Sequence, residues 1–270
     1  KGAACGAAGQ QRVPISFLKD LEIPLPPLAE QQRIVARIEE LTRRVEEARR
    51  LRREAVSEAE GYIPAAIAAV FAELKQKGWR WMRVGEVIKI DTSPVVPKNT
   101  PDADFNYMAL DNIESGTGQI IKFTSTKGDQ IKSNKFVFSS EHVLLGKLRP
   151  YLNKILVPNF SGICATDILP LRPKPDYLTR EFLAVCLRSP YFMQYCIMKM
   201  EGTKMPRLRT PDLVAYEIPI PPLSEQRRIV EYLNGLQAKV NDLKRLQAET
   251  EAELATFTPA LLAKAFRGEL

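Results

Sequence analysis

The amino-acid sequence predicts an α+β fold in which one globular domain lies between two long helices that pair with each other. A helical element occurs twice, because Ile23 to Val35 (IPLPPLAEQQRIV) returns almost unchanged as Ile218 to Val230 (IPIPPLSEQRRIV). Each copy continues into a charged segment whose apolar residues have heptad spacing. The stretch between the copies is rich in strand-forming residues and, at about 140 residues, has the usual size of a domain.

We expect four parts along the 270 residues. The first residues resemble the end of a domain, because Leu18 and Glu22 fall opposite Leu213 and Glu217 in the register of the repeat. The predicted parts are a closing segment of a preceding domain at residues 1–28, a first helical region at 29–77, a globular domain at 78–222 and a second helical region at 223–270.

The junction at Ile23–Leu28 predicts extended backbone, because its prolines lack an amide donor and fix φ. After each junction the apolar residues recur in steps of four and three, which defines a coiled-coil seam. We expect the helices to end near Gly61 and Thr258, at about 40 to 45 Å in length, with Pro64 and Pro259 opening short second helices. The seam residues are Ile34, Ile38, Leu41 and Val45, continuing to Leu51 or Arg52, and Ile229, Leu233, Leu236, Val240 and Leu243.

The middle of the chain predicts a mixed domain, since runs of β-branched and aromatic residues alternate with loops that carry Pro, Gly, Asn and Asp. Two segments with apolar faces at helical spacing follow these runs. The predicted strands cover Val84–Ile90, Tyr107–Ile113, Phe136–Leu148, Lys154–Val157 and Ile168–Leu171, and the predicted helices cover Thr179–Leu187 and Pro190–Met200.

The net charge of +7 is concentrated in this middle domain. Residues 79–212 hold 19 Lys and Arg against 13 Asp and Glu, whereas the helical segments carry nearly equal numbers of both signs. A basic globular unit between charge-balanced helices indicates contact with a polyanion, most economically a nucleic acid. The alternative is an ordinary solvated basic surface.

Other classes of site have little support in the sequence. Cys5, Cys164, Cys186 and Cys196 are scattered without metal-ligand spacing, so we expect reduced thiols and no metal site. His142, the single histidine, has no evident Ser or Cys partner, and we expect a surface or strand histidine. No run approaches about 18 consecutive apolar residues and the first residues lack the apolar core of a signal peptide, so we expect a cytoplasmic protein.

The chain resembles the DNA-specificity subunits of type I restriction and modification systems over essentially its whole length. The resemblance rests on the repeated junctions at Ile23 and Ile218, the run Gly146–Lys154 (GKLRPYLNK) and the segment Gly162–Pro173. It implies target-recognition domains that alternate with two conserved helices, and these helices pair as an antiparallel coiled coil. One recognition domain is present here, so the resemblance leaves open a fragment, a truncated chain or a half-subunit that pairs with a second copy of itself.

The resemblance implies recognition of double-stranded DNA with a bipartite target, without catalysis by this chain. The sequence agrees, since it lacks a phosphate-binding loop of the GxxxxGK[ST] type and the [ND]PP[YF] run of adenine methyltransferases. No cofactor is expected on this chain. The implied partners are methyltransferase subunits that use S-adenosylmethionine to methylate adenine N6, and restriction subunits that use ATP and Mg. The alternative is a coiled-coil adaptor that binds the methyltransferase subunits without recognising DNA itself.

Candidate DNA contacts come from basic and amide-bearing loops. Mobile lysines suit phosphates, whereas Arg suits guanine and Asn or Gln suits adenine in the major groove. Arg207 and Arg209 are the favoured residues for base readout, while each lysine taken singly also fits a solvated surface residue. The run around Pro150 fits DNA contact and a structural turn equally well. The candidates are Lys122, Lys127, Lys132, Lys135, Lys147, Arg149, Tyr151, Asn153, Lys154, Lys204, Arg207 and Arg209.

Overall fold

The computed structural model describes residues 15–20, 23, 25–123, 125–200 and 205–269. The chain forms two compact units. One contains residues 1–56 and 243–270, and the other contains residues 57–242. The predicted α+β class, with one mixed domain and two long helices, is confirmed.

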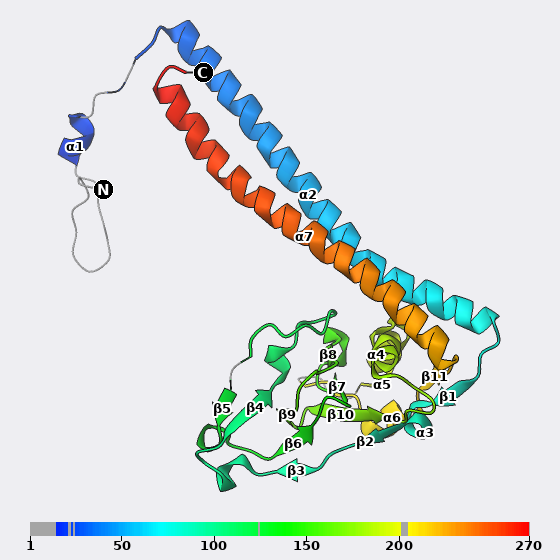
Figure 1. The fold of residues 1–270 in the computed structure, drawn as a ribbon. Coiled ribbons are helices and arrows are strands. Elements are labelled where there is room, and N and C mark those ends of the chain that lie inside the picture. Colours follow the sequence, from blue (N-terminus) through cyan, green and yellow to red (C-terminus); the bar gives the residue numbers. More distant parts are fainter. Residues whose placement is uncertain (1–14, 21–22, 24, 124, 201–204, 270) are drawn as a thin grey trace. The chain divides into compact units, whose positions relative to one another are not determined.

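Two long helices dominate the helical content, and shorter helices belong to the domain (Figure 1). The α-helices are α1 (Ile15–Lys19), α2 (Leu28–Gln76), α3 (Val84–Val87), α4 (Arg180–Arg188), α5 (Pro190–Lys199), α6 (Thr210–Ala215) and α7 (Leu223–Phe266). The 3-10 helices are η1 (Pro97–Asn99), η2 (Leu110–Asn112), η3 (Gly128–Gln130) and η4 (Pro150–Leu152).

Within each unit, α2 and α7 run side by side in opposite directions (Figure 1). In the first unit Arg49 Nε lies 3.1 Å from Glu251 Oε1 across the pair. The seam residues Val45, Ile229, Leu233 and Val240 are buried, and the other predicted seam positions are half-buried. Of the two alternatives for the next seam position, the structure favours Arg52, which is half-buried, over Leu51, which is 52% exposed.

The predicted helix ends at Gly61 and Thr258 are wrong. Both helices continue through Pro64 and Pro259, so they contain 49 and 44 residues and span roughly 74 and 66 Å. A proline in a helix interior removes one backbone hydrogen bond and is normally costly. In the domain unit, buried Ala59, Ile67 and Phe71 continue the packed face of α2 across the proline, which offsets that loss.

The strands form three small sheets. Pairing is antiparallel throughout, except between β4 and β9. The sheets have the orders β1-β11, β2-β10-β7-β8 and β3-β6-β9-β4-β5. The strands are β1 (Trp81–Arg83), β2 (Ile88–Ile90), β3 (Pro94–Val95), β4 (Asp104–Met108), β5 (Ser125–Lys127), β6 (Lys135–Phe138), β7 (Val143–Gly146), β8 (Ile155–Leu156), β9 (Gly162–Cys164), β10 (Ile168–Pro173) and β11 (Glu217–Pro219).

Two predicted strands are divided in the structure. Val84–Ile90 begins as helix α3, because this turn packs on α6, where a Cβ on Gly85 would lie 2.8 Å from Val214 Cβ. Phe136–Leu148 contains strands β6 and β7, which belong to different sheets and are separated by a turn at Ser139 to His142. Apolar runs alone do not show where a strand changes sheet.

The main core joins the end of α2 to the domain. Ile67, Phe71 and Leu74 lie in one buried cluster with residues of α4 and α5 such as Phe182 and Phe192. By length and composition alone, α2 contains a window long and apolar enough to cross a membrane, and 17% of that window is buried in the protein.

Candidate nucleic-acid interface

The run Gly146–Lys154 forms a loop with two residues in an uncommon backbone conformation. Arg149 has φ 49° and Asn153 has φ 48°, so both lie in the left-handed region. They flank the 3-10 turn η4, in which Pro150 is buried and Tyr151 is 46% exposed. Because non-glycine residues rarely adopt this conformation, surrounding contacts must hold the loop in place.

Backbone hydrogen bonds attach this loop to two other segments. Arg149 N donates to Pro206 O at 2.7 Å, and Leu208 N donates to Lys147 O at 3.0 Å. On the other side, Gly116 N donates to Asn153 O at 3.1 Å. Segments 112–123, 147–154 and 205–209, far apart in the sequence, are therefore joined by backbone hydrogen bonds, and we call them the loop cluster.

Several predicted cations lie on the loop cluster with exposed side chains. Lys122, Arg149, Arg207 and Arg209 are exposed, and Lys147 is half-buried. Arg207 Nε lies 3.3 Å from Asp167 Oδ1, and Arg209 Nε lies 2.9 Å from Asp212 Oδ2. These partners orient the two guanidinium groups while leaving each roughly half exposed.

Apolar side chains accompany the cations. Ile121 is 64% exposed beside Lys122, and Phe123 packs its ring 5.1 Å from that of Phe160. With Tyr151 on the neighbouring loop, the surface combines cations with apolar and aromatic groups. Such a surface can contact phosphates and base edges together.

Two candidates within the loop have structural roles that the sequence left open. Lys154 Nζ donates to Leu110 O at 2.7 Å. The Asn153 amide donates to Arg188 O at 3.4 Å, while its Oδ1 is buried. Because one amide hydrogen bond is made inside the domain and its oxygen is buried, the Asn153 side chain holds the loop, and its contact with DNA stays a prediction.

Lys135 does not fit the prediction of a mobile surface cation. Its residue is only 4% exposed, and its ammonium donates to Ser133 O at 2.9 Å and Ser133 Oγ at 2.6 Å. The ammonium also lies 5.2 Å from the centroid of the Tyr107 ring. Desolvation by burial lowers the pKa of Lys135.

Three further lysines lie outside the loop cluster or outside the described residues. Lys127 is exposed on β5, where its Nζ lies 3.7 Å from Asp104 Oδ1. Lys132 is exposed in the loop before β6. Lys204 lies outside the described residues.

The prediction for His142 is corrected, because this residue is only 2% exposed and has a serine partner. Ser139 N donates to His142 Nδ1 at 3.0 Å, so the opposite nitrogen, Nε2, carries the proton toward Asp91 Oδ2 at 3.2 Å. A hydrogen bond from Lys89, with others from His142 and Arg172, lowers the pKa of Asp91 to about 2. The buried histidine thus joins a turn to the ion pairs of Asp91 with Lys89 and Arg172, both of which are partly exposed.

The described cysteines are buried and unpaired. Burial raises the pKa of Cys164 and Cys196 to about 12, and that of Cys186 further. Within the described residues, no group of three or more His, Cys, Asp or Glu side chains is arranged to hold a metal. Cys5 lies outside the described residues.

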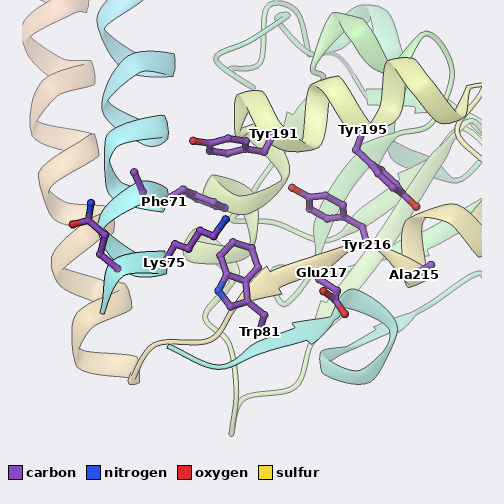
Figure 2. A pocket seen from close by; sticks show the side chains of 10 residues that line it. Phe71, Lys75, Trp81, Tyr191, Tyr195, Ala215, Tyr216 and Glu217 are labelled. Atoms are coloured by element: carbon purple, nitrogen blue, oxygen red, sulfur yellow. The ribbon is translucent and has the colours of Figure 1, made fainter. Parts of the chain in front are cut away.

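A cavity of about 780 Å³ marks the joint between the end of α2 and the domain. Figure 2 shows Phe71 and Lys75 of α2 reaching toward Trp81 of β1 and Tyr191 of α5. The Phe71 ring centroid lies 6.4 Å from that of Trp81 and 5.9 Å from that of Tyr191. Trp81 thus packs at the junction, and half-buried Trp79 packs against the main core.

Arg188, at the end of α4, contacts the loop cluster but is not among the residues predicted from the sequence. Its Nη2 donates to Ile155 O at 2.7 Å. Because this contact depends on two loops folding over the helix end, no local pattern in the sequence indicates it.

Comparison with known proteins identifies related chains. Residues 3–54 and 76–254 match a family model described as a type I restriction modification DNA specificity domain. The EcoDI specificity subunit of Escherichia coli is 31% identical over 192 residues, which cover 71% of this chain and 42% of that protein. The MjaVIII specificity subunit of Methanocaldococcus jannaschii is 24% identical over 266 residues, which cover 89% of this chain and 61% of that protein.

Two solved structures are similar in fold. One, a chain from a study of complex assembly and conformational transition of the type I R-M system, has a TM-score of 0.76 and 34% identity. The other, the HsdS subunit from Thermoanaerobacter tengcongensis, has a TM-score of 0.62 and 34% identity. They cover 97% and 98% of this chain, and 65% of each solved chain is matched. This chain therefore spans less than two thirds of these relatives.

Proposed function

The chain belongs to the type I restriction modification DNA specificity family, and from this premise we propose that it is a non-catalytic subunit that recognises double-stranded DNA. The loop cluster is the observation that carries the proposal. It joins three segments, distant in the sequence, that carry Lys122, Lys147, Arg149, Arg207 and Arg209. Convergent cations on fixed backbone suit a sequence-reading surface better than scattered lysines do.

The roles divide by side-chain geometry. Arg149, Arg207 and Arg209 have planar guanidinium groups that can donate two hydrogen bonds to guanine in the major groove. Lys122 and Lys147 are compact cations suited to phosphates. The ion pairs of Arg207 and Arg209 with Asp167 and Asp212 fix the direction of each guanidinium before DNA arrives, which reduces the entropy lost on binding.

The helices would serve as spacer and docking surface. Paired helices that together extend over several turns can hold a recognition domain at a fixed distance from a second one, whether in the same chain or in another copy, and so set the gap in a bipartite target. The proposed partners are methyltransferase subunits, which would bring S-adenosylmethionine, and restriction subunits, which would bring ATP and Mg. This chain would select the DNA and the partners would act on it.

DNA binding by the full chain tests the proposal. A pool of random-sequence duplexes would be incubated with the chain, and the bound fraction would be sequenced. We expect enrichment of a short motif and an affinity that falls as salt rises. Arg149→Ala should lower the affinity for the enriched duplex by roughly 5- to 100-fold, the value of one good base contact.

Two further variants separate the contact types. Lys122→Ala should weaken all sequences alike and reduce the salt slope by about 1. Arg43→Ala, on the exposed face of α2, serves as the matched control and should change neither. The absence of any salt-dependent DNA affinity would favour the coiled-coil adaptor instead, and methyl transfer by the purified chain from labelled S-adenosylmethionine would contradict a non-catalytic role.

The spacer role has its own test. Inserting one helical turn near Val45 of α2 should change the tolerated gap between the two halves of the DNA target. The measurement is methylation of duplexes with varied gaps by the chain and its methyltransferase partners. An unchanged gap would contradict the spacer role and leave DNA recognition untouched.

A further inference from the structure

Arg188, the last residue of α4, contacts the C-terminal end of the 147–154 loop through both its side chain and its backbone carbonyl. Its Nη2 donates to Ile155 O at 2.7 Å, directly after the loop. Its backbone carbonyl accepts from the Asn153 amide at 3.4 Å, and Asn153 is the left-handed residue that closes the turn. The end of α4 is therefore hydrogen-bonded to the chain on both sides of Lys154, where the loop leads into strand β8.

Segment 112–123 of the loop cluster packs closely against the hydrogen bond between Arg188 and Ile155. A Cβ at Gly118, where φ is +70°, would lie 1.8 Å from Ile155 O and 2.3 Å from Arg188 Nη2. Gly116 N also donates to Asn153 O. The two loops thus meet above the contact between Arg188 and Ile155, and only a residue without a side chain fits at position 118.

The electrostatic setting of Arg188 gives little reason for it as a stabilising group. No acidic side chain among the described residues forms an ion pair with it, and its Nε is buried without a hydrogen-bond partner in that part of the chain. Burial accordingly lowers the pKa of Arg188 to about 10. Arg188 is half-buried, and a charge taken from water without a carboxylate partner recovers little of its desolvation cost.

The geometry offers a different use. Arg149 and Asn153 are held in sparsely populated backbone conformations, which persist only when several contacts fix them. The rigid planar fork of an arginine can hold a carbonyl at a set position and direction, which an apolar side chain cannot do.

We propose that Arg188 is a positioning residue for DNA recognition, which fixes both loops of the cluster so that Arg149 and Tyr151 face the bases in one conformation. The inference rests on the proposed function, since it assumes that the loop cluster contacts DNA. Arg188 itself does not touch the DNA.

The test compares Arg188→Met with a matched variant at the other end of the same helix. Arg180 also donates to backbone carbonyls, Ser140 O and Pro158 O, and it lies at the start of α4, so Arg180→Met is the control. Arg188→Lys restores a donor without the planar fork. Each full-length variant is titrated with the duplex enriched by the wild-type chain and with the random-sequence pool, and its Tm is recorded.

We expect Arg188→Met to lower the affinity for the enriched duplex by about tenfold and to leave the affinity for the random pool within about twofold. Its Tm should fall no further than that of Arg180→Met, which also loses a donor to backbone carbonyls. Arg188→Lys should recover part of the loss, and Arg180→Met should keep the wild-type preference. If Arg188→Met does not fold, Gly118→Ala provides the second variant, because it keeps the guanidinium and should cause the same selective loss.

Two results would overturn the inference. One is an Arg188→Met protein with the wild-type preference for the enriched duplex. The other is equal loss of affinity for both DNA probes together with a lower Tm, which would make Arg188 a purely structural residue. A wild-type chain that binds neither probe would instead contradict the proposed function itself.

Discussion

The two copies of the repeated element have nearly the same sequence but very different surroundings. In the second copy, Ile218 is fully buried in strand β11, which pairs with β1. In the first copy, Ile23 is 63% exposed and Leu25 is 79% exposed. The copies thus share the helix start but differ in whether a domain covers the junction before it.

The ends of the two helices show the reverse difference. In α2, Ile67 and Phe71 are 4% and 2% exposed, because they lie in the core with α4 and α5. Their counterparts in α7, Leu262 and Phe266, are 42% and 66% exposed. The apolar end of α2 is therefore buried by the domain that follows it, whereas the equivalent residues of α7 remain exposed.

Shortening a side chain near the C-terminal end of α2 should have the largest effect on stability. Phe71→Ala removes a ring packed on Trp81 and Tyr191 and should lower the free energy of unfolding by about 3 to 5 kcal/mol. Phe266→Ala, the same change in the other copy, should alter it by less than about 0.5 kcal/mol. Urea unfolding of both variants measures the difference, and equal losses would contradict the comparison.

Substituting the equivalent glutamines at the starts of α7 and α2, one at a time, should have a smaller effect on stability. Gln226 is fully buried, accepts from Thr179 N and donates to Tyr177 O and Pro221 O. Its counterpart Gln31 is half-buried and donates to Pro26 O at 2.7 Å. Gln226→Ala leaves buried backbone groups unpaired.

We therefore expect Gln226→Ala to cost roughly 2 to 3 kcal/mol, and Gln31→Ala to cost less than about 1 kcal/mol. Thermal unfolding followed by circular dichroism checks both values. A Gln31 variant as unstable as the Gln226 variant would mean that the first junction is also docked.

The first-turn carboxylates should give the smallest difference. Hydrogen bonding by Arg228, with a further contribution from Lys77, lowers the pKa of Glu225 to about 2. A lowered folded-state pKa means that the stabilisation is present above the unfolded-state value near 4.3 and is lost as pH falls toward 2. Glu225→Gln should therefore reduce the loss of stability between about pH 4 and pH 2.

The counterpart Glu30 pairs with Arg33 on an exposed surface, where the same arrangement also lowers its pKa. Among the described residues, Glu30 lacks a second cation comparable to Lys77, whose Nζ lies 3.5 Å from Glu225 Oε1. Acid titration of Glu30→Gln should show a smaller change than that of Glu225→Gln. A larger change would mean that solvent exposure does not weaken the first pair.

The sequence predicts best the parts of the fold that belong to its internal repeat. The repeat at Ile23 and Ile218 predicts both long helices, and the heptad spacing identifies residues that the structure buries or half-buries, such as Val45 and Val240. Local proline chemistry is less informative, because Pro64 would end an isolated helix but is tolerated where Ile67 and Phe71 pack on a domain.

The candidate site is harder to predict because it is built from long-range contacts. The sequence identifies Arg149 and Arg207 as cations, but the backbone contacts that bring their two segments together, such as the bridge between Leu148 and Arg207, cannot be seen in it. The burial of Lys135 and His142, and the position of Arg188 under two loops, likewise depend on residues distant in the sequence.

Hydrogen–deuterium exchange with and without the enriched DNA duplex tests the central claim most directly. If the loop cluster reads DNA, amides in residues 112–123, 147–154 and 205–209 should exchange more slowly with DNA bound, while those along α2 and α7 should not change. Protection confined to the helices, with none in the loop cluster, would contradict the account.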